Sequence, residues 1–573
     1  MIASPPAAQD RYGVRVEENV PARMRDGTIL RSDVAWPIAR AGETQTFPVL
    51  LTRTPYQKRP LPHLAERGYI AVSQDVRGIH ASDGDFDPVC QPCGALADRD
   101  DGYDTTLWAA GLDASDGRVG VFGLSYPAWE AWELAISRPA PLVAMYVSGM
   151  AVTSTSVEPL PRPGRRLQWL VAAGAPDIRR RRGLPGPQTR ADADRLWHVE
   201  RHKWLWFLPW SELPEHALGP MTPYCKEYFQ HSTRDHFRFA GQHHHVDVPV
   251  FHRTGWYDRW VHTIDHFTAM RTEAPSEHAR QSQRLLVGPW GHTGTLTRKV
   301  GDFDFGPDAE MTDTDLMLRW FDFWLQGAQN GALDEPPVRY FMMGRNEWRA
   351  ADTWPPRSNT PTIWYFASGG HANTASGDGA LVTSPSGRGA EDRYAYDPRD
   401  PVPTVWPLDD QNVPLDHRPI DWRQDLLVYV TDPLGEPVEI AGVPSVDLWA
   451  SSSAFDTDFI TRLADVHPDG RVQPLVTGIV RARHREGYDR PPRLLSPGVA
   501  ERYAIPLGPL AHCFLPGHRI RLEVTSSDFP NYDRNHNSGL DDFSDATLAV
   551  AHQTVLHGAD HPSGVTLPVL AAA

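Results

Sequence analysis

The chain has 573 residues, more than one hydrophobic core usually contains, so we expect two to four domains. Its formal net charge of −16 would repel nucleic acid, which is itself a polyanion. No segment approaches the roughly 20 consecutive apolar residues of a membrane-spanning helix, and residues 1–20 contain no apolar run typical of a signal peptide. These features predict a cytoplasmic protein with no nucleic-acid or membrane partner.

The first part of the chain alternates between strand and helix patterns. Asp26-Gly27 separates two strand-like runs and predicts a hairpin. A buried strand follows over 47–54, a helix over 104–112, and a strand over 117–124 that ends at Ser125. This alternation predicts a mostly parallel sheet covered by helices.

Two changes in composition and apolar spacing along the chain predict further domains. Between 156 and 245, Arg, Trp and Pro dominate and the apolar residues have helical spacing, which indicates an inserted cap. The α/β pattern then returns, with strands before Asp258 and His292 and a helix over 312–327 that Thr312 or Thr314 can cap and Gly327 can end. After 334 short β-rich runs such as 337–343, 425–431 and 519–527 predict an all-β module.

Three residues carry the most specific chemical signal. A serine hydroxyl needs a histidine base and a carboxylate that orients the histidine. Ser125, Asp258 and His292 occur in the order that α/β-hydrolases use, and each follows an expected strand. The carboxyl ends of parallel strands form the functional edge of such a sheet, so we expect the three side chains to meet there.

A set of motifs in fixed order resembles the cocaine esterase-like (CocE/NonD) hydrolases, which are related to X-prolyl dipeptidyl peptidases. The motifs are NVPARMRDGTILRSDVAWP, RTPY, QDVRGIHASDGDFDP, DGYDTTLWAA, GRVGVFGLSY, GWYD, GPWGH and LRWFDFWLQG. The resemblance covers nearly the whole chain. It implies an α/β-hydrolase core at residues 1–155 and 246–334, a helical cap at 156–245 and a jelly-roll-like β-sandwich at 335–573.

The same resemblance implies roles for individual residues. Ser125, Asp258 and His292 correspond to the family's catalytic triad, and no cofactor or metal is implied. The Tyr56 hydroxyl and the backbone N–H of Tyr126 correspond to an oxyanion hole, whose donors stabilise charge on the substrate oxygen. Trp260 corresponds to an aromatic residue that faces the substrate.

The turn at Ser125 departs from the usual pattern. Pro127 and Ala128 occupy positions where related hydrolases carry glycine. Proline is tolerated in the first turn of a helix, but the residue before it is disfavoured in the helical region. We therefore expect a nucleophile turn that keeps the Tyr126 N–H, with Ser125 Oγ within hydrogen-bond reach of His292.

Several other features have two readings. Seven arginines between Arg162 and Arg182 form either a solvated face or a site for an anionic acyl or leaving group. The cap tryptophans are either core residues or a roof over the substrate; they are Trp169, Trp197, Trp204, Trp206 and Trp210. For His243–His245 we favour a structural role over metal binding. For Cys90 and Cys93, in an expected loop, we favour a disulfide or free thiols over zinc.

The expected function is hydrolysis of a small-molecule ester or amide through an acyl-enzyme, with the acyl group unidentified. One alternative is an acyltransferase or acylase-type amidase that uses the same triad. Another is a non-catalytic binding protein that retains the fold. A serine-directed probe separates enzyme from binder, and trapping with an acceptor separates transferase from hydrolase. Assembly as a homo-oligomer is left open.

Overall fold

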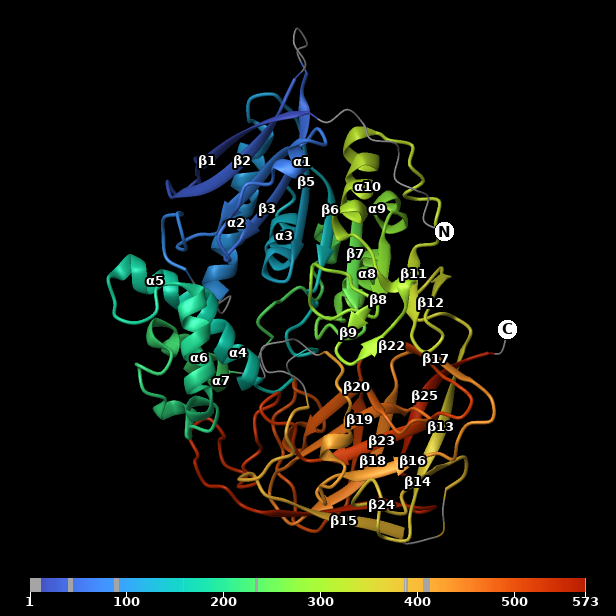
Figure 1. The fold of residues 1–573 in the computed structure, drawn as a ribbon. Helices are drawn as coiled ribbons and strands as arrows, with labels where there is room; N and C mark the ends of the chain where they lie inside the picture. The colour runs from blue at the N-terminus through green and yellow to red at the C-terminus, as the bar shows by residue number, and fades with distance from the viewer. Residues whose placement is uncertain are drawn as a thin grey trace.

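Three units make up the computed structural model, which describes residues 12–39, 45–86, 92–157, 159–231, 235–385, 387, 390–405 and 413–571. Figure 1 shows an α/β unit at the top, a helical cap at its left and a β-rich unit below. The architecture confirms the expected α/β-hydrolase core with an inserted helical cap and a C-terminal β domain.

The core is organised around a ten-stranded sheet of order β1-β2-β4-β3-β5-β6-β7-β8-β11-β12. All neighbours from β4 to β11 pair in parallel, and the pairs at the two edges are antiparallel. The strands are β1 (Gly13–Arg23), β2 (Ile29–Ile38), β3 (Phe47–Thr54), β4 (Ile70–Asp75), β5 (Ser115–Leu124), β6 (Leu142–Ser148), β7 (Val250–Gly255), β8 (Arg284–Gly288), β11 (Val338–Met342) and β12 (Glu347–Ala351). The predicted hairpin is present, with Gly27 at φ 90° between β1 and β2.

Helices cover both faces of this sheet because its strands are apolar on both sides. In β3, Val49 and Leu51 pack on the α3 side, whereas Leu50 packs with Phe321 on the α10 side. Such two-sided burial is typical of parallel sheets. The core helices are α1 (Pro62–Ala65), α2 (Pro92–Ala110), α3 (Tyr126–Ile136), α8 (Thr263–Glu273), α9 (Glu277–Gln281) and α10 (Asp313–Gln326). As predicted, α10 ends at Gly327, whose φ is 72°, and Thr312 precedes the helix, but its side chain makes no capping hydrogen bond.

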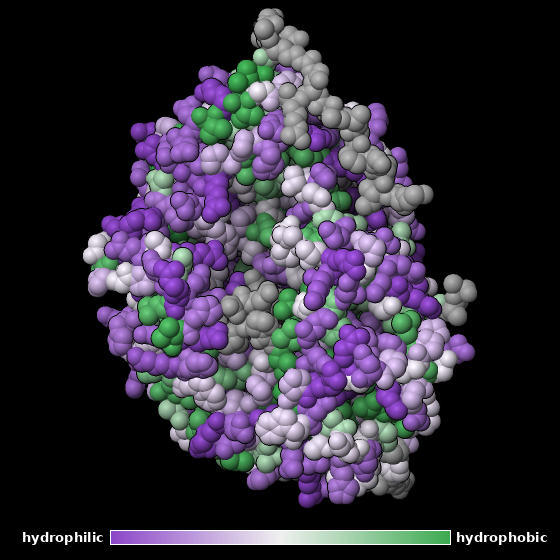
Figure 2. Space-filling view, viewed as in Figure 1, coloured by the Kyte–Doolittle hydropathy of each residue, from purple (hydrophilic) through white to green (hydrophobic). Residues whose placement is uncertain are grey.

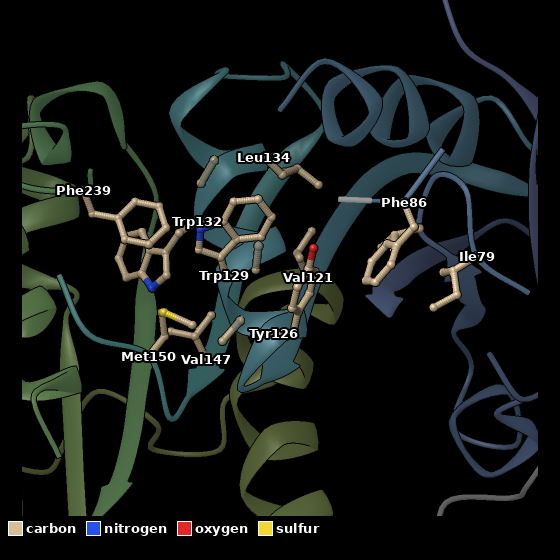
Figure 3. Close-up of a cluster of buried hydrophobic side chains, with 14 of the residues drawn as sticks. Ile79, Phe86, Val121, Tyr126, Trp129, Trp132, Leu134, Val147, Met150 and Phe239 are labelled. Atoms are coloured by element: carbon tan, nitrogen blue, oxygen red, sulfur yellow. The ribbon is translucent and has the colours of Figure 1, made fainter. Parts of the chain in front are cut away.

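Aromatic residues of α3 fix this helix against the sheet. Figure 3 shows Trp129 and Trp132 among Val121 of β5 and Val147 of β6, and both tryptophans are about 1% exposed. Burying two such side chains contributes several kcal/mol, on the order of 2–3 kcal/mol for each. The helix that begins beside Ser125 therefore has a rigid base.

The cap inserts between β6 and β7 and consists of short helices. They are α4 (Pro163–Trp169), the π-helical turn η1 (Leu170–Gly174), α5 (Ala175–Arg182), α6 (Arg190–Leu205), η2 (Trp210–Glu212), η3 (Gly219–Met221), α7 (Thr222–Gln230) and η4 (His243–His245). Thr189 caps α6 by accepting a hydrogen bond from the Asp192 amide.

The C-terminal unit is a β domain whose pairings are nearly all antiparallel. Its strands are β13 (Asn359–Ala367), β14 (Ala380–Val382), β15 (Ala390–Tyr396), β16 (Leu427–Val430), β17 (Val438–Gly442), β18 (Ser445–Ser452), β19 (Asp458–Val466), β20 (Val472–Arg481), β21 (Glu501–Pro506), β22 (Leu510–Phe514), β23 (Arg519–Thr525), β24 (Ala551–His557) and β25 (Gly564–Leu570). Figure 1 shows an orange-red segment of this domain reaching the underside of the cap.

Two expectations about local structure were wrong. The run 337–343 does not begin the β module, because β11 pairs with β8 and β12 pairs with β11, which extends the core sheet. The boundary between the core and the β domain at residue 334 stays a prediction. Cys93 lies in α2 instead of a loop, whereas Cys90 lies outside the described residues.

No helix among the described residues is long and apolar enough to cross a membrane. Figure 2 shows one face of the molecule, which hydrophilic side chains cover for the most part. The cytoplasmic location, the absence of a nucleic-acid partner and the assembly state stay predictions.

Candidate active site

Ser125 lies on a tight turn between β5 and α3. Its φ of 66° and ψ of −125° are a strained combination for a residue with a side chain. The turn closes because Gly123 lacks a Cβ: such an atom would lie 2.3 Å from the carbonyl carbon of Pro127. Pro127 is the second residue of α3, and Ala128 is fully buried without displacing the helix. The two unusual residues are thus compatible with the expected turn.

Asp258 and His292 meet on the loops that follow β7 and β8. The Nδ1 atom of His292 lies 3.0 Å from both carboxylate oxygens of Asp258. Asp258 Oδ1 also accepts a hydrogen bond of 2.8 Å from the backbone N–H of Trp260. Asp258 is 3% exposed, so its carboxylate is shielded and held in one orientation. The contact suits the His292 tautomer that carries its proton on Nδ1, and in that tautomer Nε2 is the acceptor nitrogen.

Gly149, directly after β6, sets the position of His292 from the other side. Its φ is 63°, and a Cβ there would lie 2.7 Å from His292 Cε1. The sequence analysis missed this residue, although its place at the carboxyl end of a central strand is a usable signal. Within the described part of the chain, no hydrogen bond joins Ser125 Oγ to His292, contrary to expectation. Such bonds are often long in enzymes without substrate.

Tyr56 follows β3 and lies near the start of α3. Its hydroxyl oxygen accepts a hydrogen bond of 3.1 Å from Trp169 Nε1 in the cap. The Trp169 ring also stacks on the Tyr126 ring, with centroids 6.2 Å apart and an interplanar angle of 12°. Below, Arg53 of β3 forms a buried ion pair with Glu130 of α3, which ties the two elements that present Tyr56 and Tyr126. Burial raises the pKa of Glu130 well above its usual value, against the opposing effect of Arg53.

These side chains surround a cavity of about 300 Å³ between core and cap. Six of the seven predicted site residues line it, and Asp258 lies behind His292. The lining residues are Tyr56, Leu124, Ser125, Tyr126, Trp129, Met150, Ser154, Arg165, Arg166, Trp169, Leu170, Arg190, Tyr228, His236, Phe237, Arg259, Trp260 and His292. A serine, a histidine with an oriented tautomer and a tyrosine hydroxyl in one small cavity can perform acyl transfer to and from the serine.

Several lining residues were missed from sequence. Tyr228, His236 and Phe237 come from a part of the cap in which nothing distinguishes them from core residues. Arg190 begins α6, outside the conspicuous arginine run, and Arg259 follows Asp258 directly. Only Arg259 has a sequence signal, its place in the loop that carries the acid.

The structure distinguishes between the two interpretations of the cap tryptophans and arginines. Trp169 lines the cavity, whereas Trp197, Trp204 and Trp210 are core residues and Trp206 is 43% exposed. Arg165 and Arg166 line the cavity. Arg179–Arg182 belong to α5 and are not among the residues that line it. Of these, Arg180 pairs with Asp177, and Arg181 donates to the Ser82 carbonyl.

The consecutive histidines do not converge on one point. His243 Nε2 contacts His266 Nδ1 at 2.9 Å, while the rings of His244 and His245 lie against each other. The described residues contain one group whose spacing would suit a metal ion, Asp465, His467 and His518 in the β domain. It lies apart from the cavity residues, and the sequence analysis did not single it out.

Comparison with known proteins decides the family. A family model described as X-Pro dipeptidyl-peptidase (S15 family) matches residues 26–294, and one described as the X-Pro dipeptidyl-peptidase C-terminal non-catalytic domain matches residues 330–566. Cocaine esterase of Rhodococcus sp. (strain MB1 Bresler) is 35% identical over 97% of this chain and 98% of its own length. The chain belongs to the cocaine esterase (CocE/NonD) family of hydrolases. This confirms the expected class, a serine hydrolase of ester or amide bonds.

Other relatives agree with this assignment. A putative serine esterase of Mycobacterium bovis is 31% identical, over 49% of this chain and 46% of that protein. Among solved structures, an aminopeptidase of a marine sediment Thaumarchaeota archaeon superposes with a TM-score of 0.79 at 24% identity, covering 99% of this chain and 98% of that one. An α-amino acid ester hydrolase gives a TM-score of 0.72 at 24% identity, with the same coverage of both chains. At these identities the two structures support the fold alone.

Proposed function

We propose that this hydrolase cleaves a small-molecule ester or amide with a triad of Ser125, His292 and Asp258. The observation that carries the assignment is the bidentate contact of His292 Nδ1 with Asp258 beside a serine on a strained turn. Ser125 attacks the substrate carbonyl while His292 Nε2 takes its proton. His292 then returns the proton to the leaving group, and water releases the acyl group by the reverse sequence.

In this proposal two donors stabilise the oxyanion. The Tyr56 hydroxyl already accepts a hydrogen bond from Trp169, so its own proton remains for the substrate oxygen. The backbone N–H of Tyr126 is at the N-terminal end of α3, where helix amides and the helix dipole favour negative charge. Trp260 and Trp169 are proposed to contact the substrate, because both line the cavity.

A fluorophosphonate probe, followed by peptide mapping, tests the nucleophile. We expect a single adduct at Ser125, no adduct in Ser125→Ala, and slow labelling in His292→Ala. Turnover of a panel of simple esters and amides should fall by a factor on the order of 10⁴ or more in Ser125→Ala. Full activity in that variant, or an adduct at another serine, would refute the triad. A wild-type protein with neither turnover nor labelling would instead favour a binding role.

A further inference from the structure

The sequence motif QDVRGIHASDGDFDP contains a histidine, His80, that the proposed triad does not use. His80 lies in the loop after β4 with φ 53°, a left-handed conformation that is uncommon outside glycine, although histidine adopts it more often than most residues. Its neighbour Ile79 is fully buried beside Phe86, as Figure 3 shows. Ser82 Oγ donates to the Asp75 carbonyl at 2.7 Å and so closes the turn. These contacts hold the His80 backbone in one place.

The His80 side chain contacts the loop that carries Tyr56. Its Nε2 atom lies 3.0 Å from the carbonyl oxygen of Pro55. A carbonyl oxygen can only accept a hydrogen bond, so Nε2 carries a proton and is the donor. The accepting carbonyl belongs to the planar peptide unit that joins Pro55 to Tyr56. His80 therefore fixes the orientation of the backbone directly before the Tyr56 side chain.

Further hydrogen bonds hold the same loop. The Tyr56 amide donates to Thr54 Oγ1 at 3.0 Å, and the Lys58 amide donates to Asp75 Oδ1 at 2.7 Å. At the far end of the side chain, the Tyr56 hydroxyl accepts its hydrogen bond from Trp169 of the cap. Tyr56 is thus held by the core at its backbone and by the cap at its hydroxyl.

The cap also contacts His80 directly. The His80 amide donates to Asp177 Oδ2 of α5 at 2.7 Å, and the His80 Nδ1 atom lies 3.5 Å from Oδ1 of the same carboxylate. Asp177 is 2% exposed and also pairs with Arg180. Because His80 bonds to Asp177 through its amide and to Pro55 through its ring, this single residue joins α5 to the Tyr56 loop.

We infer that His80 is a positioning residue that fixes Tyr56 in the proposed oxyanion hole. An oxyanion donor acts only where it meets the developing charge at hydrogen-bond distance, and a misplacement of about 1 Å can cost on the order of a hundredfold in rate. Without the His80 bond, the peptide unit before Tyr56 can tilt, and the hydroxyl at the far end of the side chain moves with it. This inference rests on the proposed function, in which Tyr56 stabilises the oxyanion.

Two substitutions of His80 separate the effect of the hydrogen bond from that of the backbone conformation. His80→Asn suits the left-handed φ, but its amide is too short to take the place of Nε2. His80→Gln suits this φ less well, but its longer side chain can still donate to the Pro55 carbonyl. In steady-state kinetics on 4-nitrophenyl butyrate, we expect His80→Asn to lower kcat by about tenfold, with KM within about twofold of the wild type. His80→Gln should keep most of the wild-type kcat.

A double-mutant cycle with Tyr56→Phe tests whether His80 acts through Tyr56. In the Tyr56→Phe background, His80→Asn should lower kcat by less than about twofold, because the hydroxyl that His80 positions is already absent. His63→Asn is the control, since His63 is exposed on α1 of the same unit, and it should keep the wild-type kcat. Circular dichroism and thermal melting should establish that all variants fold.

Each failure has its own signature. The positioning role would be overturned by a wild-type kcat in His80→Asn, by equal losses in His80→Asn and His80→Gln, or by an undiminished effect of His80→Asn in the Tyr56→Phe background. In each of these cases the proposed function would stand, provided that Ser125 is still labelled and Tyr56→Phe is slow. A wild-type kcat in Tyr56→Phe would remove the oxyanion role of Tyr56 and this inference together, while labelling of Ser125 would still report on the triad.

Discussion

The contact between Tyr56 and Trp169 places one residue of the cap against a donor of the proposed oxyanion hole. Tyr56→Phe should lower kcat by roughly 10²–10³ with little change in KM, because the lost bond strengthens in the transition state. Trp169→Phe keeps an aromatic ring over Tyr126 but removes the indole N–H that orients the Tyr56 hydroxyl. We expect it to lower kcat by about tenfold, the effect of one ordinary hydrogen bond.

Steady-state kinetics on one ester distinguishes these effects. The double variant should be no slower than Tyr56→Phe, because Trp169 is proposed to act on the reaction through Tyr56. Additive losses in kcat would show that Trp169 acts independently of Tyr56. A large KM increase in Trp169→Phe with kcat unchanged would show that Trp169 only binds substrate.

Gly149 leads to a second prediction at the scale of one residue. Gly149→Ala places a methyl group 2.7 Å from His292 Cε1 on a backbone with φ 63°, so His292 or the loop after β6 must move. We expect kcat to fall by a factor on the order of 10² while secondary structure is retained. Gly183→Ala is a matched control, since Gly183 has φ 62° with open space around its Cβ position. Equal activity in the two alanine variants would contradict the proposed role.

Among the elements, a buried carboxylate of β19 links this strand to β22 and to the turn that leads into β23. Asp465 of β19 accepts hydrogen bonds from His512 Nε2 at 3.0 Å and from His518 Nδ1 at 2.9 Å. Burial raises the pKa of Asp465, but the bonds from His512 and His518 outweigh it and lower the pKa to about 2. The folded-state pKa is thus below the ordinary value of 3.8. The resulting stability is present above about pH 4 and is lost as the pH falls toward 2.

Asp465→Asn measures this contribution. Near neutral pH the variant should unfold with a free energy about 2–3 kcal/mol smaller than the wild type. The difference should shrink as the pH is lowered from about 4 to 2. Denaturant titrations at a series of pH values check both parts, and a difference that does not depend on pH would contradict them.

Helices and strands were predictable from the sequence where neighbouring residues alone determine them. The strands before Ser125, Asp258 and His292, and the end of α10 at Gly327, follow from apolar runs and turn chemistry. The assignment of β11 and β12 to the core sheet was not predictable, because a strand's pattern does not specify its partner. The sequence also did not show which arginines of the run line the cavity. A cluster of charges in the sequence does not reveal which side of a helix packs against the rest of the protein. Gly149 was missed because the side chain that leaves no room for a Cβ there, His292, is far away in the sequence.

At the scale of the whole molecule, the β domain supports the cap from below. The Gly164 amide donates to the Pro530 carbonyl at 2.9 Å, and Trp210 Nε1 donates to Asp533 Oδ2 at 2.9 Å. Arg162, in the cap, donates through Nε to Asn531 Oδ1 at 2.9 Å, and both residues are buried. The position of the cap over Ser125 therefore depends on the segment 528–545 of another domain.

A double-mutant cycle on Arg162 and Asn531 tests this dependence. Asn531→Leu removes the acceptor that Nε and Nη2 of the buried guanidinium share, and it should destabilise the protein by about 2 kcal/mol, as should Arg162→Met. The double variant should lose about 1 kcal/mol less than the sum of the single effects. Because a loosened cap binds substrate less well, KM should rise in the single variants. Strictly additive effects with unchanged KM would show that the contact does not hold the cap.

The support of the cap by segment 528–545 also affects how the protein matures. The chain is synthesised from its N-terminus, so Ser125, the cap and His292 leave the ribosome more than 200 residues before the segment that holds the cap. During that interval the cap lacks its lower contacts, and its residues Trp206 and Trp210 have no partner across the domain boundary. The cavity beside Ser125 therefore gains the support of its cap only when translation is nearly finished. A nascent chain halted before residue 528 has all three residues of the proposed triad but an unsupported cap.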